Sequence, residues 1–125
     1  MQLAAVSSTP AFRPPPRYTG FTDALVRVQQ ARDDLATLHY TRAQFQLGKA
    51  TMAVSYGAML LRTTERTYEN VNRFMHASQD IGFALGHLGW LVSVAPGTPD
   101  PNRHLEGAYA LLDAAEQALR ELPTQ

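Results

Sequence analysis

The chain has no proline between Pro16 and Pro96, although it holds eight prolines in 125 residues. Proline breaks helices because it lacks an N–H donor and clashes with the preceding turn. Within this stretch apolar residues recur at steps of three and four, which is the spacing of one helix face. The sequence therefore predicts an all-α protein with four helices, over residues 21–39, 42–77, 79–94 and 101–122.

The segment from Ser78 to Val94 is the predicted centre of this fold. It is apolar on nearly every side, and a helix of that kind is normally buried by its neighbours. Gly82, Gly86 and Gly89 recur in it at helical intervals, and glycine allows another backbone to approach closely. Each glycine costs a helix about 1 kcal/mol relative to alanine. We therefore expect close packing at these glycines, because it would offset that cost.

The first and last helices carry the clearest apolar seams. One seam begins at Ala24 and runs to Leu38, and the other begins at Leu105 and runs to Leu122. Asp100 before Pro101 adds a typical helix start, with a capping residue followed by proline at the first helical position. We expect both helices to face the core through these seams.

The second predicted helix, residues 42–77, is longer than its neighbours. About 35 residues rise roughly 50 Å, against about 25–33 Å for the other helices. A monomer would have to break this helix, with Gly57 as the expected position, or leave part of its apolar face uncovered. Exposed apolar stripes are uncommon in monomers. The length therefore favours a homodimer, in which a second copy covers an inner face that includes Phe45 and Met52.

The first 20 residues differ in composition from the rest. Three consecutive prolines lie between Arg13 and Arg17, and proline both removes a hydrogen-bond donor and restricts the residue before it. The sequence predicts a disordered proline-rich arm over residues 1–20, followed by a helical bundle domain over residues 21–122.

Composition removes several classes of function. The chain has no cysteine, which excludes disulfides and thiol chemistry. Its formal charge is zero, so the total charge points neither to nucleic acid nor to an anionic membrane. The longest apolar run, residues 81–95, is shorter than the roughly 20 residues that span a bilayer. No basic stretch followed by an apolar one marks a secretory signal, so we expect a cytoplasmic protein without membrane contact.

Motifs that would carry catalysis or a cofactor are missing. The phosphate-binding Gly-rich loop, the Gly-x-Ser-x-Gly elbow and His-Glu-x-x-His do not occur. His76 and Asp80 are four residues apart and could share an ion, with Glu69 one turn back, but too few ligands converge to specify a metal. We expect no catalytic residue, no metal and no cofactor. His87, the only histidine within the apolar segment, is expected to be buried and hydrogen-bonded, with a ligand pocket as the alternative.

Charge along the chain supports an alternative function. Residues 41–77 hold five basic and two acidic side chains, whereas residues 96–125 hold two basic and five acidic ones. The predicted second helix would align several arginines on one face, and guanidinium groups match phosphate geometry. The alternative is a nucleic-acid-binding or RNA-processing bundle, and its site comprises Arg13, Arg17, Arg62, Arg66 and Arg73.

Arg32 and His39 are seven residues apart and would share a helix face. This spacing is similar to the Arg-x(4–6)-His motif of HEPN-type helical ribonucleases, in which the arginine and the histidine act on the phosphodiester. Asp33 and Asp34 lie between them and would repel an RNA backbone. The likeness covers only these eight residues, and we assign the chain to no family.

The sequence favours a non-enzymatic helical interaction protein that homodimerises and binds another macromolecule. Its expected form is an antiparallel four-helix bundle with one long helix, and its partners are a second copy and an unidentified protein. An enzyme or ligand carrier with an internal pocket around His87 is a further alternative. The expected dimer contacts are Gly82, Gly86, Gly89 and Trp90, together with the uncovered half of the second helix.

Overall fold

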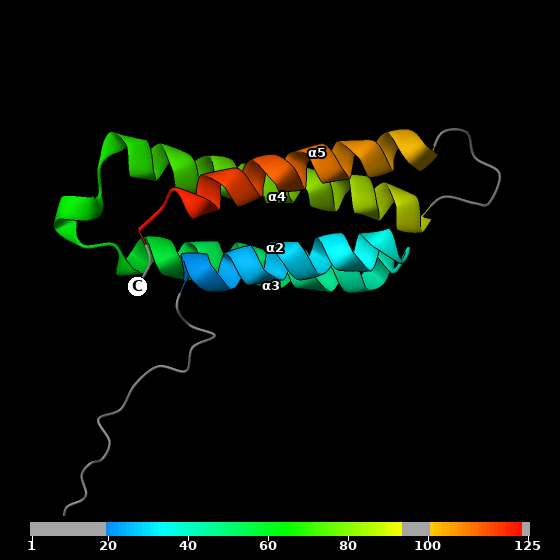
Figure 1. The fold of residues 1–125 in the computed structure, drawn as a ribbon, viewed down its shortest axis with the longest axis horizontal. Helices are drawn as coiled ribbons and strands as arrows, with labels where there is room; N and C mark the ends of the chain where they lie inside the picture. The colour runs from blue at the N-terminus through cyan, green and yellow to red at the C-terminus, as the bar shows by residue number, and fades with distance from the viewer. Residues whose placement is uncertain (1–19, 94–100, 124–125) are drawn as a thin grey trace, which may run out of the picture.

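The computed structural model describes residues 20–93 and 101–123, and these form four α-helices and one 3₁₀ turn without any strand. Successive helices run in opposite directions, with α2 and α3 in one layer and α4 and α5 in the other (Figure 1). Each layer packs on the other through α3 with α4 and α2 with α5. The elements are α2 (Phe21–Ala36), α3 (Tyr40–Leu60), η2 (Thr63–Glu65), α4 (Tyr68–Ser93) and α5 (Pro101–Arg120).

The prediction of an all-α antiparallel four-helix bundle is therefore confirmed for the described part of the chain. The predicted arm, with Arg13 and Arg17, lies outside the described residues except for Gly20. None of the helices that the structure describes has the length and the apolar character needed to cross a membrane.

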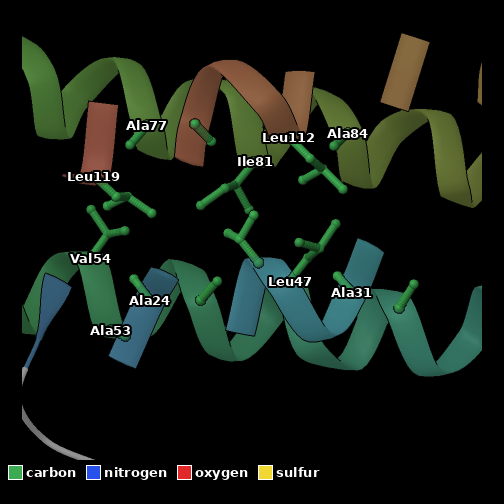
Figure 2. Close-up of a cluster of buried hydrophobic side chains, with 14 of the residues drawn as sticks. Ala24, Ala31, Leu47, Ala53, Val54, Ala77, Ile81, Ala84, Leu112 and Leu119 are labelled. Carbon is green, nitrogen blue, oxygen red and sulfur yellow. The ribbon is translucent and has the colours of Figure 1, made fainter. Parts of the chain in front are cut away.

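The core between the two layers is lined largely by alanine. Nine of its 21 buried apolar residues are alanine. Figure 2 shows Ile81, Leu112 and Leu119 of the α4–α5 layer pointing toward Leu47 and Val54 of the other layer. Small side chains let helix axes approach, and a few larger ones then fill the remaining space at interior packing density. The core is consequently narrow and has little room for large side chains.

The seam predicted for the last helix is confirmed. Its residues are buried at the intervals expected for one face, and the first of them packs partly buried against the same core. These residues are Leu105, Ala108, Leu112, Ala115, Leu119 and Leu122. Because this helix has only one apolar seam, its orientation follows directly from the sequence.

The seam of α2 is buried as far as Leu35 but not at Leu38, where the prediction was wrong. The helix ends at Ala36, and a Schellman motif closes it. In this motif the His39 N–H donates to the Asp34 carbonyl at 2.8 Å, and the Leu38 N–H donates to the Leu35 carbonyl at 3.0 Å. Leu38 takes the left-handed conformation with φ 61°, where glycine is usual. Its side chain is 62% exposed as a result.

The predicted continuous helix over residues 42–77 is wrong. The chain passes Gly57 without a break and leaves the helix at Leu61. Thr67 then caps α4, because its Oγ1 accepts a hydrogen bond from the Asn70 N–H at 3.1 Å. The Asn70 side chain also donates to the Glu65 carbonyl at 2.8 Å, which fixes the turn. The helix therefore restarts at Tyr68, and the predicted start at residue 79 falls inside it.

The long helix of the bundle is thus α4, with 26 residues, next to α3 with 21. These lengths rise by roughly 39 and 32 Å, so neither helix projects far beyond the bundle. The mismatch of helix lengths that favoured a second copy is smaller than predicted, because α4 exceeds the 16 residues of α2 by a rise of about 15 Å. Any reason for a dimer has to come from the surface of the helices.

Close backbone approach occurs at other glycines than those predicted. Gly82 and Gly86 face outward, and a Cβ on either would meet no atom within 4 Å. A Cβ on Gly20 would instead lie 2.5 Å from the Gly57 Cα, and one on Gly57 would lie 2.8 Å from the Phe21 ring. Gly20 also has φ 70°, which glycine adopts without strain. The start of α2 therefore rests on α3 through two glycines.

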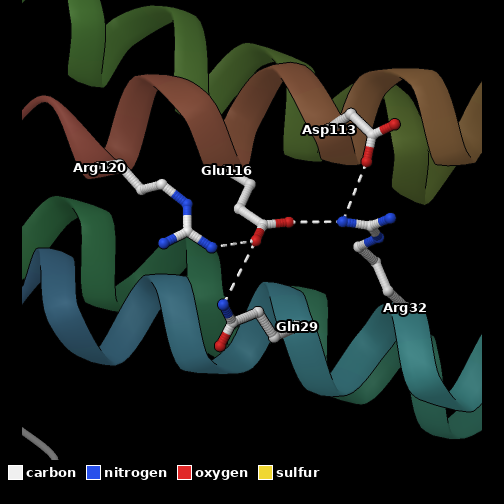
Figure 3. Close-up of polar contacts among 5 residues, drawn as sticks. All are labelled: Gln29, Arg32, Asp113, Glu116 and Arg120. Carbon is white, nitrogen blue, oxygen red and sulfur yellow. Dashed lines mark hydrogen bonds and ion pairs between the residues drawn. The ribbon is translucent and has the colours of Figure 1, made fainter.

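A buried carboxylate joins α2 to α5 (Figure 3). The side chain of Glu116 is 12% exposed and accepts hydrogen bonds from Arg120 at 2.6 Å, Arg32 at 2.7 Å and Gln29 at 3.3 Å. Arg32 also pairs with Asp113 at 3.0 Å. Burial alone would raise the pKa of Glu116, but the three hydrogen bonds outweigh burial and hold its pKa below the ordinary value.

Two glycine variants test this packing. We expect Gly57→Ala to lower the free energy of unfolding by about 1–3 kcal/mol, because the added Cβ would overlap the Phe21 ring. Gly86→Ala should raise it by about 0.5–1 kcal/mol, because its surroundings are open and alanine favours the helix. Urea unfolding measures both values. Equal effects of the two variants would contradict the assignment of Gly57 as the packed position.

Leu38→Gly should raise the free energy of unfolding by about 1 kcal/mol. The left-handed conformation is costly for leucine and natural for glycine, and little buried area is lost with an exposed side chain. Leu38→Ala is the control, because alanine keeps the strain and should bring no gain. A gain in the alanine variant as large as in the glycine variant would show that exposure, not backbone strain, is the cause.

Glu116→Gln tests the buried carboxylate. We expect a loss of about 1–2 kcal/mol at neutral pH, since charge-assisted hydrogen bonds are replaced by weaker ones. The folded-state pKa is lowered, so this stability is present above the ordinary range of glutamate and disappears as pH falls through the lowered value, below about pH 4. Wild type and variant should therefore converge in acid.

The matched control is Glu121→Gln, whose partner Arg73 lies 3.2 Å away on the surface. An exposed pair of this kind contributes less than about 1 kcal/mol. A loss of stability at Glu116 that does not change with pH would contradict a role for its charge.

Candidate interaction surface

Besides its core side, α3 carries a second apolar stripe that faces solvent. Phe45, Met52 and Met59 are seven residues apart and so lie along one line of the helix. They are 59%, 66% and 73% exposed. The prediction that Phe45 and Met52 face inward was wrong, because the buried side of α3 is formed by residues such as Leu47 and Ala50. The larger apolar residues are thus left outside the core.

A similar stripe runs along α4. Met75, Gly82 and Gly86 are seven and four residues apart, which places them on one line of the helix. Phe83 lies further round the helix toward α5, on the line of Trp90 seven residues later, which stacks on His104 of α5. Met75 is 59% exposed and Phe83 is 56% exposed. The opposite side of the helix is buried, as at Ile81. The predicted burial of this segment on all sides is therefore wrong, and half of its apolar surface faces solvent.

The two stripes are neighbours on the surface. α3 and α4 pack against each other in opposite directions (Figure 1), and the Gln44 amide lies 4.0 Å from the position of a Cβ on Gly89. Counting eight residues from this contact along both helices puts Met52 level with Ile81, next to Gly82. At about 100° per residue, each stripe follows the contact line on its solvent side. We define the α3–α4 face as Phe45, Met52, Met59, Met75, Gly82 and Gly86.

The α3–α4 face contains no charged side chain. Arg42 and Lys49 are the only charged residues of α3, and the Lys49 ammonium lies 5.4 Å from the centre of the Phe45 ring at the edge of the face. From Phe74 to Ser93, α4 contains only Asp80. In contrast, α2 and α5 carry ten charged residues between them. The surface of the bundle is thus divided into a charged side and an apolar side.

The four residues predicted as dimer contacts do not share one surface. Gly82 and Gly86 belong to the α3–α4 face, whereas Gly89 faces α3. Trp90 turns toward α5 and stacks on His104, with ring centroids 4.0 Å apart. Gly82 and Gly86 therefore face open space on the outside of α4 instead of making contacts inside the chain, and their role in a dimer stays a prediction.

The arginines of the alternative site that the structure describes do not line one helix face. Arg62 and Arg66 lie in the connection between α3 and α4, and Arg73 lies in α4. Arg66 donates to the Met59 carbonyl at 3.2 Å, and Arg73 pairs with Glu121 at 3.2 Å. The predicted strip depended on a continuous helix, and the break between Leu60 and Tyr68 removes it.

Arg32 and His39 do not lie on the same helix and have different partners. The helix that contains Arg32 ends at Ala36, and His39 begins α3, where its Nδ1 is 2.7 Å from the Thr37 hydroxyl. Arg32 is held by Glu116. The prediction that they share a helix face is therefore wrong, because the turn after α2 separates them.

His87 pairs with His104, a contact that the sequence did not indicate. The two Nδ1 atoms are 2.9 Å apart. Gly107 makes room for the His87 ring, because a Cβ there would lie 2.9 Å from the His87 Nε2. The α5 side of His87 is filled by these two residues. The pair forms because the α4–α5 hairpin brings together residues 17 apart in sequence.

Among the residues that the structure describes, no three histidine, aspartate or glutamate side chains are placed to hold a metal ion together. Burial raises the pKa of Asp80, and the nearby His76 charge opposes this rise. The third candidate ligand, Glu69, is exposed on the first turn of α4.

No protein-family model matches the chain, and it has no match among curated proteins or solved structures. Function therefore has to be inferred from the surface of the bundle, on which the α3–α4 face is the feature that packing within the chain does not explain.

Proposed function

We propose that this protein is a non-enzymatic helical interaction protein of the cytoplasm that homodimerises through the α3–α4 face and binds another macromolecule. The observation that supports the proposal is the exposure of four large apolar side chains on one uncharged surface: Phe45, Met52, Met59 and Met75. Exposed apolar residues scattered singly are ordinary, but a contiguous group of this kind is typical of a contact surface.

The size of the α3–α4 face fits a protein partner. Each of its four large side chains is between 59% and 73% exposed. Taking about 200 Å² for a fully exposed large side chain, they present roughly 500 Å². A stable interface buries about 800 Å² on each partner, which the flanking residues of α3 and α4 would complete. Methionine and phenylalanine are also the residues that interfaces favour.

The same face is suited to a second copy of this chain. A two-fold dimer brings one surface against itself, so that surface needs both projections and hollows. Met52 and Met75 project, and the space above Gly82 and Gly86 is open. The lack of charge removes the like-charge repulsion that a charged surface would meet in its own copy. A second copy can therefore cover the face without leaving a buried charge.

A dimer of this kind leaves α2 and α5 toward solvent. Eight of their ten charged residues, all except the buried Asp34 and Glu116, would then belong to the outer surface that another macromolecule meets. We propose a protein as that second partner. Among the described arginines of the alternative site, Arg66 and Arg73 are held by bonds within the chain, which supports a protein partner over nucleic acid.

Met52→Glu tests the proposed dimer. Burying a carboxylate in an apolar contact is costly, so we expect the dissociation constant of the dimer to rise by about 10-fold to 100-fold. Sedimentation equilibrium at micromolar concentrations should give the mass of two chains for the wild type and of one chain for the variant. Circular dichroism should show equal helix content, because Met52 is 66% exposed in the single chain.

The matched control is Val26→Glu, which changes a 43% exposed apolar residue on α2. It should leave the dimer intact, as should the double variant Arg66→Glu and Arg73→Glu. A wild-type chain that stays monomeric, or equal effects of Met52→Glu and Val26→Glu, would overturn the proposed dimer. Salt-sensitive binding to DNA or heparin that the arginine variant abolishes would support nucleic-acid binding instead.

A further inference from the structure

The contact between His87 and His104 has a property that depends on protonation. A hydrogen bond between two Nδ1 atoms requires that one ring carries a proton on that nitrogen and that the other offers a lone pair. The atoms are 2.9 Å apart, and the ring centroids are 5.1 Å apart. The centroid separation is close to the nitrogen separation plus the two distances from ring centre to nitrogen. The two nitrogens therefore face each other head-on.

We propose that His87 and His104 form a pH-dependent latch between α4 and α5, which is closed while one Nδ1 is free of a proton and opens when both are protonated. The proposal is independent of the α3–α4 face. Histidine is the side chain that changes charge between about pH 5 and pH 8, so the change falls within a range that proteins meet.

Three states of the pair follow. With both rings neutral, one Nδ1–H donates to the other nitrogen. With one added proton the bond persists, because the charged ring donates and the neutral ring accepts, and charge strengthens it. With two added protons neither Nδ1 can accept, and two N–H groups of like charge point at each other across 2.9 Å. Only the third state breaks the contact.

The head-on geometry suits a shared proton better than a metal ion. A tetrahedral ion with bonds of about 2.0–2.1 Å would hold two nitrogens more than 3 Å apart, with lone pairs that converge beside the line between them. The lone pairs here lie along that line instead.

Neighbouring residues prevent the pair from relaxing without movement of the helices. Trp90 stacks on the His104 ring, and the Gly107 backbone lies against the His87 ring. Neither ring can turn away freely. Repulsion between the charged rings would therefore separate the first turns of α5 from the end of α4.

Within the described residues, the charged groups nearest to the pair can be named element by element. On α5, Arg103 and Glu106 are one and two residues from His104, and on α4 the nearest is Asp80, two turns before His87. α2 meets α5 through Arg32, which is bound to acidic residues more than two turns from His104. α3 meets this part of α4 with the uncharged Gln44, and its His39 and Arg42 lie beside Val92.

A double-mutant cycle measures the latch directly. His87→Leu, His104→Leu and the double variant are compared with the wild type by urea unfolding at about pH 7.5 and about pH 4.5. At the higher pH we expect a coupling of roughly five-fold in the unfolding equilibrium constant, as for one hydrogen bond. At the lower pH the coupling should vanish or change sign. A coupling that is equal at both values, or absent at the higher one, would overturn the proposal.

Two further measurements separate the latch from a general effect of acid. His76→Leu combined with His104→Leu should show no coupling at either pH, because His76 is exposed and not part of the pair. His87→Asn should keep its coupling with His104 in acid, because an amide oxygen still accepts a bond from a charged ring.

The wild type provides a readout that needs no variant, since Trp90 is the only tryptophan and stacks on His104. Its emission should shift over the same pH range in which the coupling disappears. An unchanged emission would show that the helices stay together and would overturn the proposal.

Discussion

The bundle depends on how closely its helices approach across alanine. Nine alanines line the core, and two glycines let the start of α2 rest directly on α3. A core this narrow is filled by a few residues such as Leu47 and Ile81, and further large side chains have no place in it. Phe45, Met52 and Met59 are apolar for a reason other than core packing. The α3–α4 face is thus a consequence of the close helix approach. Because the core has no room for these large side chains, they remain on the surface.

The sequence predicted the helices in which a single apolar seam determines which side is buried. α2 and α5 each carry a single apolar seam, so their buried residues followed from periodicity, apart from Leu38 at the Schellman turn. α3 has two apolar stripes, and nothing local distinguishes the stripe that meets alanine in other helices from the one that faces solvent. The break between α3 and α4 depends on the capping hydrogen bond between Thr67 and Asn70. The sequence did not reveal this cap, because the neighbouring residues are equally suited to a helix. The seven-residue spacing from Phe45 to Met59 predicted that these residues share one line of the helix, but not whether that line faces the core or solvent.

Charged residues lie mainly on α2 and α5, and exposed apolar residues lie mainly on α3 and α4. The two kinds of surface contribute differently to stability. Glu116 links α2 to α5 through arginines and a glutamine, so the charged side contributes to holding the helices together. The outer surfaces of α3 and α4 contribute little to the stability of a single chain, because their large side chains are more than half exposed. In the proposed dimer, a change there would alter association before it alters folding. The His87 contact, between residues 17 apart in the chain, depended on the hairpin geometry and was invisible to local spacing.

The even number of helices places Gly20 and the end of α5 at the same pole of the bundle (Figure 1). In a face-to-face pair the two-fold axis lies in the plane of contact. An axis along the helices would gather all four chain ends at one pole, whereas an axis across them would send two ends to each pole. The first arrangement would place everything attached to the chain ends at one end of the dimer. The second would hold two attachments apart by the length of the bundle.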